Sequence, residues 1–173
     1  MRPTLFDVRR LAGRAGLAAA FGSMILASGA LAQTAPDYQD DRSTPEAVIS
    51  SHYNAINRHE FVRGWSYWRT PPDNQTFDEY QAGYAGTASV ELQTGTPYPN
   101  PGAGQLRYTV PVSLVATQTN GSVQTYVGCV DVYLAEPSAQ AAPPFAPMAI
   151  ESADIHQIDN GLDTVTLLGG ACA

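Results

Sequence analysis

The sequence predicts an α+β domain in which three N-terminal helices pack on the concave face of a curved antiparallel sheet of four to six strands. Up to Gly86, apolar residues recur every three or four positions, which is the spacing of helices that bury one face. After Gly86 they alternate with polar residues, as in strands that are buried on one side. The pair Asn120-Gly121 then marks a tight hairpin. Helices followed by a run of strands are typical of the α+β class.

The first helix is predicted to start at residues 43–46 and to end near Asn57. Ser43 can cap it, Pro45 suits its first turn, and Glu46 stands where the carboxylate of a capping box belongs. Apolar residues then recur on one face, which is formed by Ile49, Tyr53 and Ile56.

Two shorter helices follow, and both carry aromatic residues on one face. The second is predicted from about Glu60 to Trp68, and a Pro-Pro pair at 71–72 stops it. The third starts at a capping box over residues 76–79 and ends at Gly86. The aromatic residues on these faces are Phe61, Trp65, Trp68, Phe77, Tyr80 and Tyr84.

The strands are predicted from alternation and from turn residues. A strand at 89–93 is followed by a loop rich in Gly and Pro at 95–104, and a hairpin then joins strands at 107–114 and 126–134. Pro111 has no N–H to donate, so we expect it at a bulge or facing an unpaired edge. After a loop at 136–147, residues 148–158 form a strand, and Asn160-Gly161 turns into a last strand at 164–168.

The hairpin at Asn120-Gly121 also predicts a register. A strict two-residue turn would place Asp131 beside Val110, on the apolar face. Because a slip of one residue turns every side chain over, burial selects a shifted register instead. We expect it to pair Val110 with Val132, Val112 with Val130 and Leu114 with Gly128. The turn would then contain a bulge with Gly121 in the left-handed region, and Cys129 and Asp131 would face outward.

Residues 1–32 have the features of a cleavable secretory signal peptide. Arginines precede an uncharged stretch rich in Ala and Leu, which closes on the small-residue pattern at 30–32. A retained membrane anchor is the alternative, but the stretch is short for a spanning helix and is diluted by Gly and Ser. The sequence therefore predicts a periplasmic or secreted bacterial protein, with a flexible polar lead-in at 33–42 and a single domain at 43–173.

The part after residue 32 is strongly acidic. The chain has 16 acidic and 9 basic residues, of which one acidic and four basic ones lie in the leader, so the remainder has a formal charge near −10. An acidic surface repels phosphate groups, so we expect no nucleic-acid partner and, after cleavage, no membrane. The spacing of His and carboxylate residues suits no metal, and we expect no cofactor.

Cys129 and Cys172 are the two cysteines of the chain. An even pair in an oxidising compartment indicates a disulfide, and no C-x-x-C motif suggests a redox or metal role. We expect this bond to tie the C-terminal tail to the outer face of the sheet.

Aromatic residues and turns follow one another in a characteristic order over most of residues 43–158. It includes Tyr53 to Asn57, the Phe77 to Tyr80 turn, Gly83-Tyr84, the strand entry at 87–90 and Val110 to Val112, with Phe61, Trp65, Tyr67 and Trp68 between them. In this order the chain resembles small exported bacterial members of the nuclear transport factor two-like superfamily, also called the cystatin-like cone fold. The resemblance implies a cone-shaped domain whose open end often holds a pocket. It implies no particular activity, because this fold serves enzymes, binding modules and dimerisation domains alike.

Seven aromatic residues are candidates for binding a ligand. Rings on inward faces can wall a pocket for an apolar ligand, with Tyr hydroxyls and Trp N–H groups giving orientation. The same spacing also fits a filled core, and the sequence leaves both interpretations open. The candidates are Tyr53, Phe61, Trp65, Trp68, Tyr80, Tyr84 and Tyr108.

Asp154 and His156 are the candidates for catalysis. If their strand face is concave, they could form a proton-transfer couple, as the resemblance to ketosteroid isomerase and epoxide hydrolase relatives implies. Ala153 and Ile155 compete for the inward side, and a solvated outer face is the alternative. The other histidine of interest, His52, is expected to be exposed to solvent.

Three functions remain open from the sequence. The first, which we expect, is a periplasmic non-catalytic protein that binds a small apolar ligand or a partner of the cell envelope. The second is a small isomerase-like or hydrolase-like enzyme that uses Asp154 and His156. The third is a structural domain that forms a homodimer through its sheet.

Overall fold

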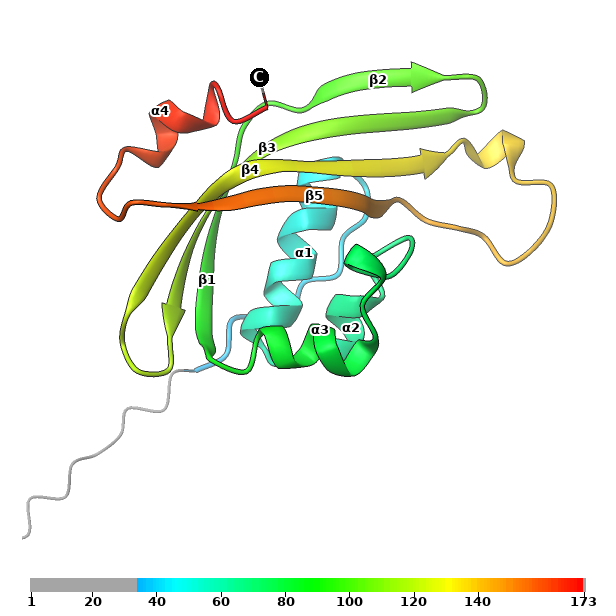
Figure 1. The fold of residues 1–173 in the computed structure, drawn as a ribbon. Coiled ribbons are helices and arrows are strands. Elements are labelled where there is room, and N and C mark those ends of the chain that lie inside the picture. The colour runs from blue at the N-terminus through cyan, green and yellow to red at the C-terminus, as the bar shows by residue number, and fades with distance from the viewer. Residues whose placement is uncertain (1–33, 173) are drawn as a thin grey trace, which may run out of the picture. The chain divides into compact units, whose positions relative to one another are not determined.

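Helices at the N-terminal end of the domain pack into the hollow of a bent antiparallel sheet (Figure 1). The structure is a computed structural model that describes residues 34–172. The fold class predicted from the sequence is confirmed, with five strands in the sheet. The signal peptide predicted at 1–32 lies outside the described residues.

Helix α1 spans Pro45–Asn57, within the bounds that the sequence predicts. Its N-cap is Thr44 rather than Ser43, and the Thr44 hydroxyl accepts a hydrogen bond from the Ala47 N–H at 3.1 Å. The capping side chain satisfies one of the N–H groups that the first turn leaves open. The buried face of α1 includes Val48, Ile49, Ala55 and Ile56, which pack against the sheet.

Helices α2 and α3 are both shorter than their predicted spans. Helix α2 covers Phe61–Trp65, and the chain then turns through Trp68, which forms a parallel bridge with Ile150. A 3₁₀ turn, η1 (Pro72–Asn74), leads to α3, which spans Phe77–Gly83. The predicted capping box of Thr76 and Glu79 is present in both directions, because each side chain bonds to the backbone N–H of the other.

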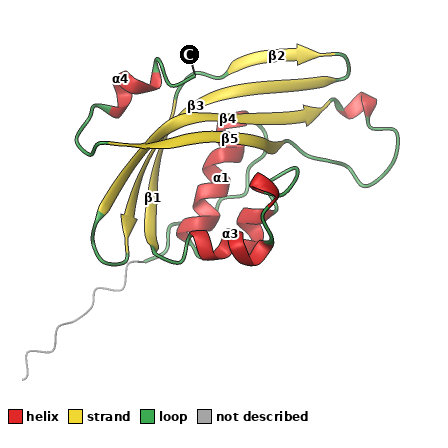
Figure 2. Ribbon diagram, viewed as in Figure 1, coloured by secondary structure: helices red, strands yellow, loops and turns green. Residues whose placement is uncertain are grey.

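The sheet has the order β1-β3-β4-β5, with β2 also beside β3 (Figure 2). Its strands are β1 (Thr87–Thr94), β2 (Tyr98–Gly102), β3 (Gln105–Gln118), β4 (Val123–Ala135) and β5 (Ala149–Ile158). Strand β2 lies in the stretch that the sequence predicts as a loop. It pairs with the first part of β3 as an edge strand, a position where Pro99 and Pro101 are tolerated since an edge strand needs donors on one side only.

Pro111 faces a break in the pairing of β3, as expected. Strand β1 pairs with β3 from Val112 onward and β2 pairs with it up to Thr109, so Pro111 stands between the two partners. Its carbonyl accepts the N–H of Gly95 at 2.8 Å, which is in the segment that crosses from β1 to β2. The missing N–H of proline therefore leaves no ladder bond unmade.

In the β3–β4 hairpin the predicted side chains face inward, but the residues that lie opposite each other differ from the prediction. Val110 lies opposite Val130, and Val112 lies opposite Gly128, two residues from the expected register. A shift of two residues keeps every side chain on its face, so the apolar pattern is equally satisfied. The turn is bulged as predicted, with Gly121 at φ 83° and the Gln118 N–H donating to Ser122 O at 2.8 Å.

Strands β3 and β4 bend strongly around α1 (Figure 1). At the bend, the backbone of β5 approaches Gly128 so closely that an added Cβ would lie 2.0 Å from Asp154 O. Only glycine leaves space for a backbone approach of this kind. Gly128 is therefore a condition for the curvature that makes the inner face concave.

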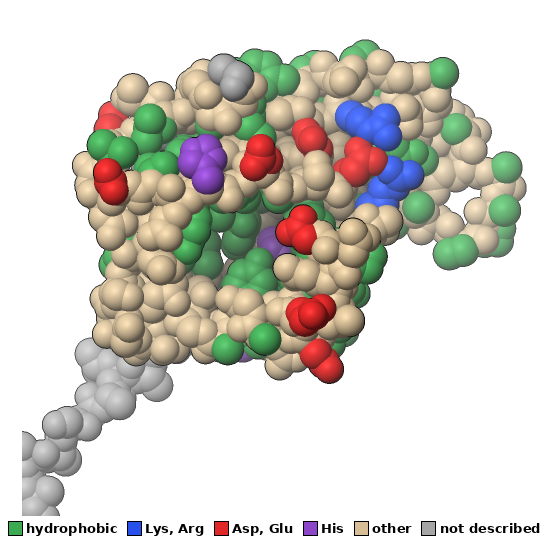
Figure 3. All heavy atoms as spheres, viewed as in Figure 1, with side chains coloured by type: hydrophobic (Ala, Val, Ile, Leu, Met, Phe, Trp, Pro, Cys, Tyr) green, Lys and Arg blue, Asp and Glu red, His purple; other side chains and the backbone are tan. Residues whose placement is uncertain are grey.

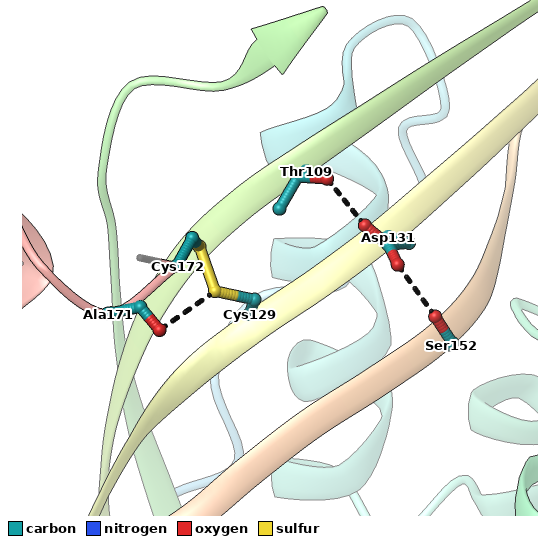
Figure 4. The surroundings of a disulfide bond; sticks show 6 residues. All are labelled: Thr109, Cys129, Asp131, Ser152, Ala171 and Cys172. Atoms are coloured by element: carbon teal, nitrogen blue, oxygen red, sulfur yellow. Dashed lines mark hydrogen bonds between the residues drawn. A yellow bond between two sulfur atoms is a disulfide. The ribbon is translucent and has the colours of Figure 1, made fainter. Parts of the chain in front are cut away.

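The last part of the chain returns over the outer face of the sheet. Residues 164–168 form a short helix, α4 (Thr164–Leu168), where the sequence predicts a strand. Asp163 caps it by accepting the Val165 N–H at 3.1 Å, a local bond that favours a helix start over a hairpin. The predicted disulfide between Cys129 and Cys172 is present and holds the tail to β4 (Figure 4).

Residues 36–42, which we call the N-terminal strap, lie along α1 and α2. The Gln39 N–H donates to Asn54 Oδ1 at 3.1 Å, and Asn54 Nδ2 donates to Asp37 O at 2.7 Å. Arg63 Nη1 donates to Gln39 O at 2.6 Å. The sequence predicts a flexible lead-in here because the residues are polar; in the structure those polar groups have partners on the helices.

Candidate functional site

A cavity of about 450 Å³ lies between the helices and β5. Figure 3 shows a hollow below β5 with hydrophobic side chains at its floor. The segment 70–75 and α3 form one wall, and residues 151–153 and Ile155 of β5 form the other. A second cavity of about 290 Å³ borders the first, with Tyr53, Gly83, Tyr84 and Ile155 lining both, and extends toward the apolar inner face of β1 and β3. Both volumes together are in the usual range for small-molecule sites.

The backbone positions Trp68 at this cavity. The Ile150 N–H donates to Tyr67 O at 2.8 Å, and the Arg69 N–H donates to Ile150 O at 2.8 Å. The turn after α2 is thereby fastened to the open edge of β5, on either side of Trp68. Because both bonds join main-chain groups, the position of this residue does not depend on the packing of its ring.

Four of the seven aromatic candidates line the cavity: Tyr53, Trp68, Tyr80 and Tyr84. Trp65 lies behind them, with its ring centroid 5.1 Å from that of Tyr80 in an edge-to-face contact. Phe61 stacks on Tyr84 at 6.3 Å and lines a separate, shallow groove beside α2. Tyr108, on β3, packs against the core and lines none of the cavities found among the described residues.

Two buried polar atoms of this wall have no hydrogen-bond partner within the described residues: Tyr80 Oη and Trp68 Nε1. Tyr80 is only 3% exposed. Its hydroxyl lies directly over Gly64, where an added Cβ would be 2.7 Å from Tyr80 Oη. The hydroxyl end of Tyr80 therefore packs against α2, and Gly64 is not among the residues that line the cavity.

The phenols that line the cavity remain neutral. Burial is the main cause that raises the pKa of Tyr53 well above its usual value, and the nearby Tyr84 and Tyr80 add to it. Burial likewise raises the pKa of Tyr84 to about 12. For Tyr80 burial and then Tyr84 raise the pKa, and the neighbouring Trp68 side chain opposes the shift. These hydroxyls therefore act as hydrogen-bond donors at neutral pH.

His52 lies behind the aromatic wall and is 1% exposed, so the expectation of a solvent-exposed histidine is wrong. It occupies the inner face of α1 next to Tyr53, and its ring is 5.9 Å from that of Trp68 and 6.4 Å from that of Tyr80. His52 Nδ1 is 3.0 Å from Gly64 O, so the bond requires the proton on Nδ1. Burial lowers the pKa of His52 to about 4.

The burial of His52 is expected to make the stability of the fold sensitive to acid. Its folded pKa of about 4 is below the unfolded value of 6.5, so between these pH values the unfolded chain binds the extra proton. The contribution of the neutral ring to stability is complete above pH 6.5 and is lost as the pH falls toward 4. We expect the free energy of unfolding to fall by about 3 kcal/mol more in the wild type than in His52→Asn between pH 7 and pH 4, measured by urea titration.

The control for this prediction is His156→Asn, because His156 is exposed on β5. This variant should follow the wild-type pH dependence, because it leaves His52 and its contacts unchanged. Parallel pH profiles for the wild type and His52→Asn would contradict the assignment of the acid sensitivity to His52.

The rim of the cavity carries charges that are already paired. Glu151, at the mouth, accepts a hydrogen bond from Arg107 Nε at 2.7 Å and is also paired with Arg69. Both guanidinium groups lie over the Tyr133 ring, at 3.8 Å for Arg69 and 5.1 Å for Arg107. The bond from Arg107 is the first cause that lowers the pKa of Glu151. No Lys, Arg or His side chain lines the cavity among the described residues.

Asp154 and His156 lie on the outer face of the sheet, so the concave placement that their catalytic role requires is not found. They line an outer depression with the disulfide, while Ala153 and Ile155 take the inward positions. Cys129 and Asp131 share this outer face, where Asp131 accepts hydrogen bonds from Thr109 and Ser152 (Figure 4). The described residues contain no cluster of three side chains suited to a metal ion.

Comparison with known proteins finds similarity among solved structures only. No family model and no curated protein matches the chain. It is similar to a nuclear transport factor 2-like superfamily protein from Salmonella enterica serovar Typhimurium, at 12% identity over 66% of this chain and 89% of that one, with a TM-score of 0.46. A conserved protein from Planctomyces limnophilus is similar at 9% identity over 65% and 94%, with a TM-score of 0.48.

A third similar structure is a candidate dehydratase of the nuclear transport factor 2-like family from Streptomyces avermitilis, at 11% identity over 65% of this chain and 93% of that one, with a TM-score of 0.45. Two of these three proteins carry the family name of the sequence resemblance. With TM-scores below 0.5 and identities of 12% or less, these neighbours leave the function to the site itself. Within residues 34–172, no helix is long and apolar enough to cross a membrane.

Proposed function

We propose that the chain is an exported, non-catalytic member of the nuclear transport factor two-like superfamily that binds a small apolar ligand between its helices and its sheet. The observation that carries the proposal is the cavity of about 450 Å³ whose wall includes four aromatic side chains. Apolar walls supply most of the affinity of such sites, and a few polar groups orient the ligand.

Two features support the exported location and the absence of catalysis. The Cys129–Cys172 disulfide fits an oxidising compartment such as the periplasm or the extracellular space. The phenols at the cavity are held neutral, and Glu151, one of the two carboxylates that line the cavity, is engaged by two arginines. Neither arrangement provides a base with a pKa near 7 at the cavity wall.

The test is native mass spectrometry of the protein isolated from the periplasm or medium of its host. We expect a monomer mass that exceeds that of residues 33–173 by one small molecule, and loss of this excess after denaturation in organic solvent. Trp68→Ala should abolish the excess mass, whereas Phe61→Ala, outside the cavity, should keep it. A dimer without bound ligand in the wild type would instead support a structural domain that pairs through its sheet.

A further inference from the structure

We propose that the ligand of the cavity is a short extended peptide that adds a strand to the open edge of β5 and is apolar on the side that faces the cavity. The inference rests on the proposed function and names the chemical class that the cavity takes. It depends on main-chain groups of β5 that border the cavity and have no partner among the described residues. An extended peptide satisfies such groups as a neighbouring strand does.

The direction of the main-chain groups follows from Ile150. Its N–H donates to Tyr67 O and its carbonyl accepts the Arg69 N–H, each at 2.8 Å, so both groups point away from β4. Ile150 lies opposite Val132, whose own main-chain groups therefore point to β3. The parallel bridge between Trp68 and Ile150 means that one extended segment of the chain itself already pairs with this edge.

The remaining edge groups of β5 follow from the regular pairing of β4. Strand β4 pairs with β3 without a bulge, so its main-chain groups alternate between β3 and β5. Every second residue counted back from Val132 therefore points to β3, and the residue opposite it on β5 points to the open edge. These opposite residues are Ala153, Ile155 and Gln157. Within residues 34–172, no hydrogen bond joins their main-chain groups to a segment outside the sheet.

Two of these edge residues, Ala153 and Ile155, line the hollow below β5 (Figure 3). The opposite wall includes Pro71 and Pro72, which have no N–H to donate. A peptide between the walls would therefore form its ladder with β5. The cavity of about 450 Å³ and its neighbour of about 290 Å³ are large enough to take the side chains of a short segment.

The two faces of β5 determine which side chains the peptide carries. Side chains beside Ala153 and Ile155 would point inward, toward Tyr53 and Tyr84, so apolar residues fit there. The residue between them would lie opposite Asp154, on the outer face. None of the ion pairs between described residues includes Asp154. Because opposite charges on adjacent strands attract, a basic residue fits this position.

The charge of the cavity sets a further condition. Among the described residues its lining includes the carboxylates Asp73 and Glu151 and no cationic side chain. A peptide that ended there with a free carboxylate would bring in a further negative charge without a partner, which is unfavourable. The ligand is therefore an internal segment of another chain, in which a basic residue stands between two apolar ones.

The experiment measures binding of the peptide N-acetyl-Val-Thr-Val-Lys-Val-amide to the mature protein by isothermal titration calorimetry. Aligned antiparallel to β5, its last three residues lie opposite Ile155, Asp154 and Ala153. N-methylation of the third or the fifth residue removes an N–H that points to β5, and should weaken binding at least tenfold. N-methylation of the fourth residue is the matched control. Its N–H points away from β5, so the affinity should be kept.

Two variants test the same contacts from the side of the protein. Ala153→Pro removes an N–H at the open edge but no bond to β4, so this variant should fold and lose the peptide. Asp154→Lys should bind the peptide about threefold less tightly than the wild type, and should bind the analogue with Glu in place of Lys more tightly.

Equal affinities of the peptide and all its N-methylated forms would overturn the inference. If no peptide binds although native mass spectrometry finds a retained small molecule, the inference fails and the proposed function stands. If neither is found, the proposed function fails as well. Self-association of the wild type that Ala153→Pro abolishes, without peptide binding, would assign the edge to a second copy of the chain and also overturn the inference.

Discussion

Loss of the Cys129–Cys172 disulfide is expected to lower the free energy of unfolding by about 4 kcal/mol. The cysteines are 43 positions apart, and the bond closes a loop that contains most of β4, all of β5 and the whole C-terminal tail. In the chain-entropy model, a cross-link stabilises the fold by restricting the unfolded chain, and a loop of this length gives that magnitude. Since domains of this size are stable by about 5–15 kcal/mol, the expected loss is a large part of the total.

The measurement is urea unfolding of the oxidised protein, the reduced protein and the Cys129→Ser, Cys172→Ser double variant. The reduced and doubly substituted forms should agree with each other, since both lack the cross-link. Ligand binding at moderate temperature should be retained, because the disulfide lies on the outer face and the cavity on the inner one. Equal midpoints for all three forms would show that the disulfide contributes nothing to stability.

Gly128→Ala is expected to destabilise the domain by about 3 kcal/mol or more. The new Cβ would lie 2.0 Å from Asp154 O and 2.7 Å from the Cα of Ile155. Both atoms belong to the backbone of β5, so no side-chain rotation can relieve the contact, and the two strands have to separate at the bend. Overpacking that displaces backbone is at the high end of the costs measured for small-to-large substitutions.

The matched control is Gly170→Ala, because an added Cβ there meets no atom within 4 Å. We expect this variant to remain within about 0.5 kcal/mol of the wild type in the same chemical denaturation series. If Gly128→Ala unfolds at the wild-type urea concentration, the sheet is not held at its curvature by the close approach of β4 and β5.

The sequence predicts most of the fold because helix caps and the spacing of apolar residues favour the same elements that the structure contains. The box of Thr76 and Glu79 fixes the start of α3, and the apolar alternation fixes which face of β3 and β4 is buried. Alternation has a period of two, however, so it cannot distinguish the expected partner of Val110, Val132, from the observed one, Val130. The side-chain pattern determines which face of each strand is buried, and the length of the turn determines which residues lie opposite each other.

Two elements escaped prediction because their causes are not local. Strand β2 contains Pro99 and Pro101 and exists because β3 extends past β1 and offers a free edge. Helix α4 follows Asn160-Gly161, which indicates a hairpin when read alone, but the tail is drawn to the outer face of β4 by Cys172. The disulfide that the sequence predicts already argues against the last strand, since a strand paired to β5 would lead away from Cys129.

The sequence predicts that the candidate site is aromatic, but it does not predict which aromatic residues line the cavity. The aromatic stripes of α2 and α3 indicate an aromatic interior, and Trp68, Tyr80 and Tyr84 line the cavity. Periodicity alone cannot separate them from Trp65, which packs one layer deeper. His52 was missed because a polar residue in an amphipathic pattern is taken as exposed, and its partner, the carbonyl of Gly64, has no trace in the sequence pattern.

The N-terminal strap supports the wall of the cavity, although none of its residues lines the cavity. Asp40 accepts the Tyr67 hydroxyl at 2.6 Å, while Arg42 lies over the Tyr67 ring and donates to Ser66 O at 3.1 Å. These contacts brace the peptide immediately before Trp68 from the far side of α2. Removal of residues up to Arg42 would therefore take away side-chain contacts that hold the chain just before Trp68, and would leave its backbone bonds to Ile150 as the remaining support.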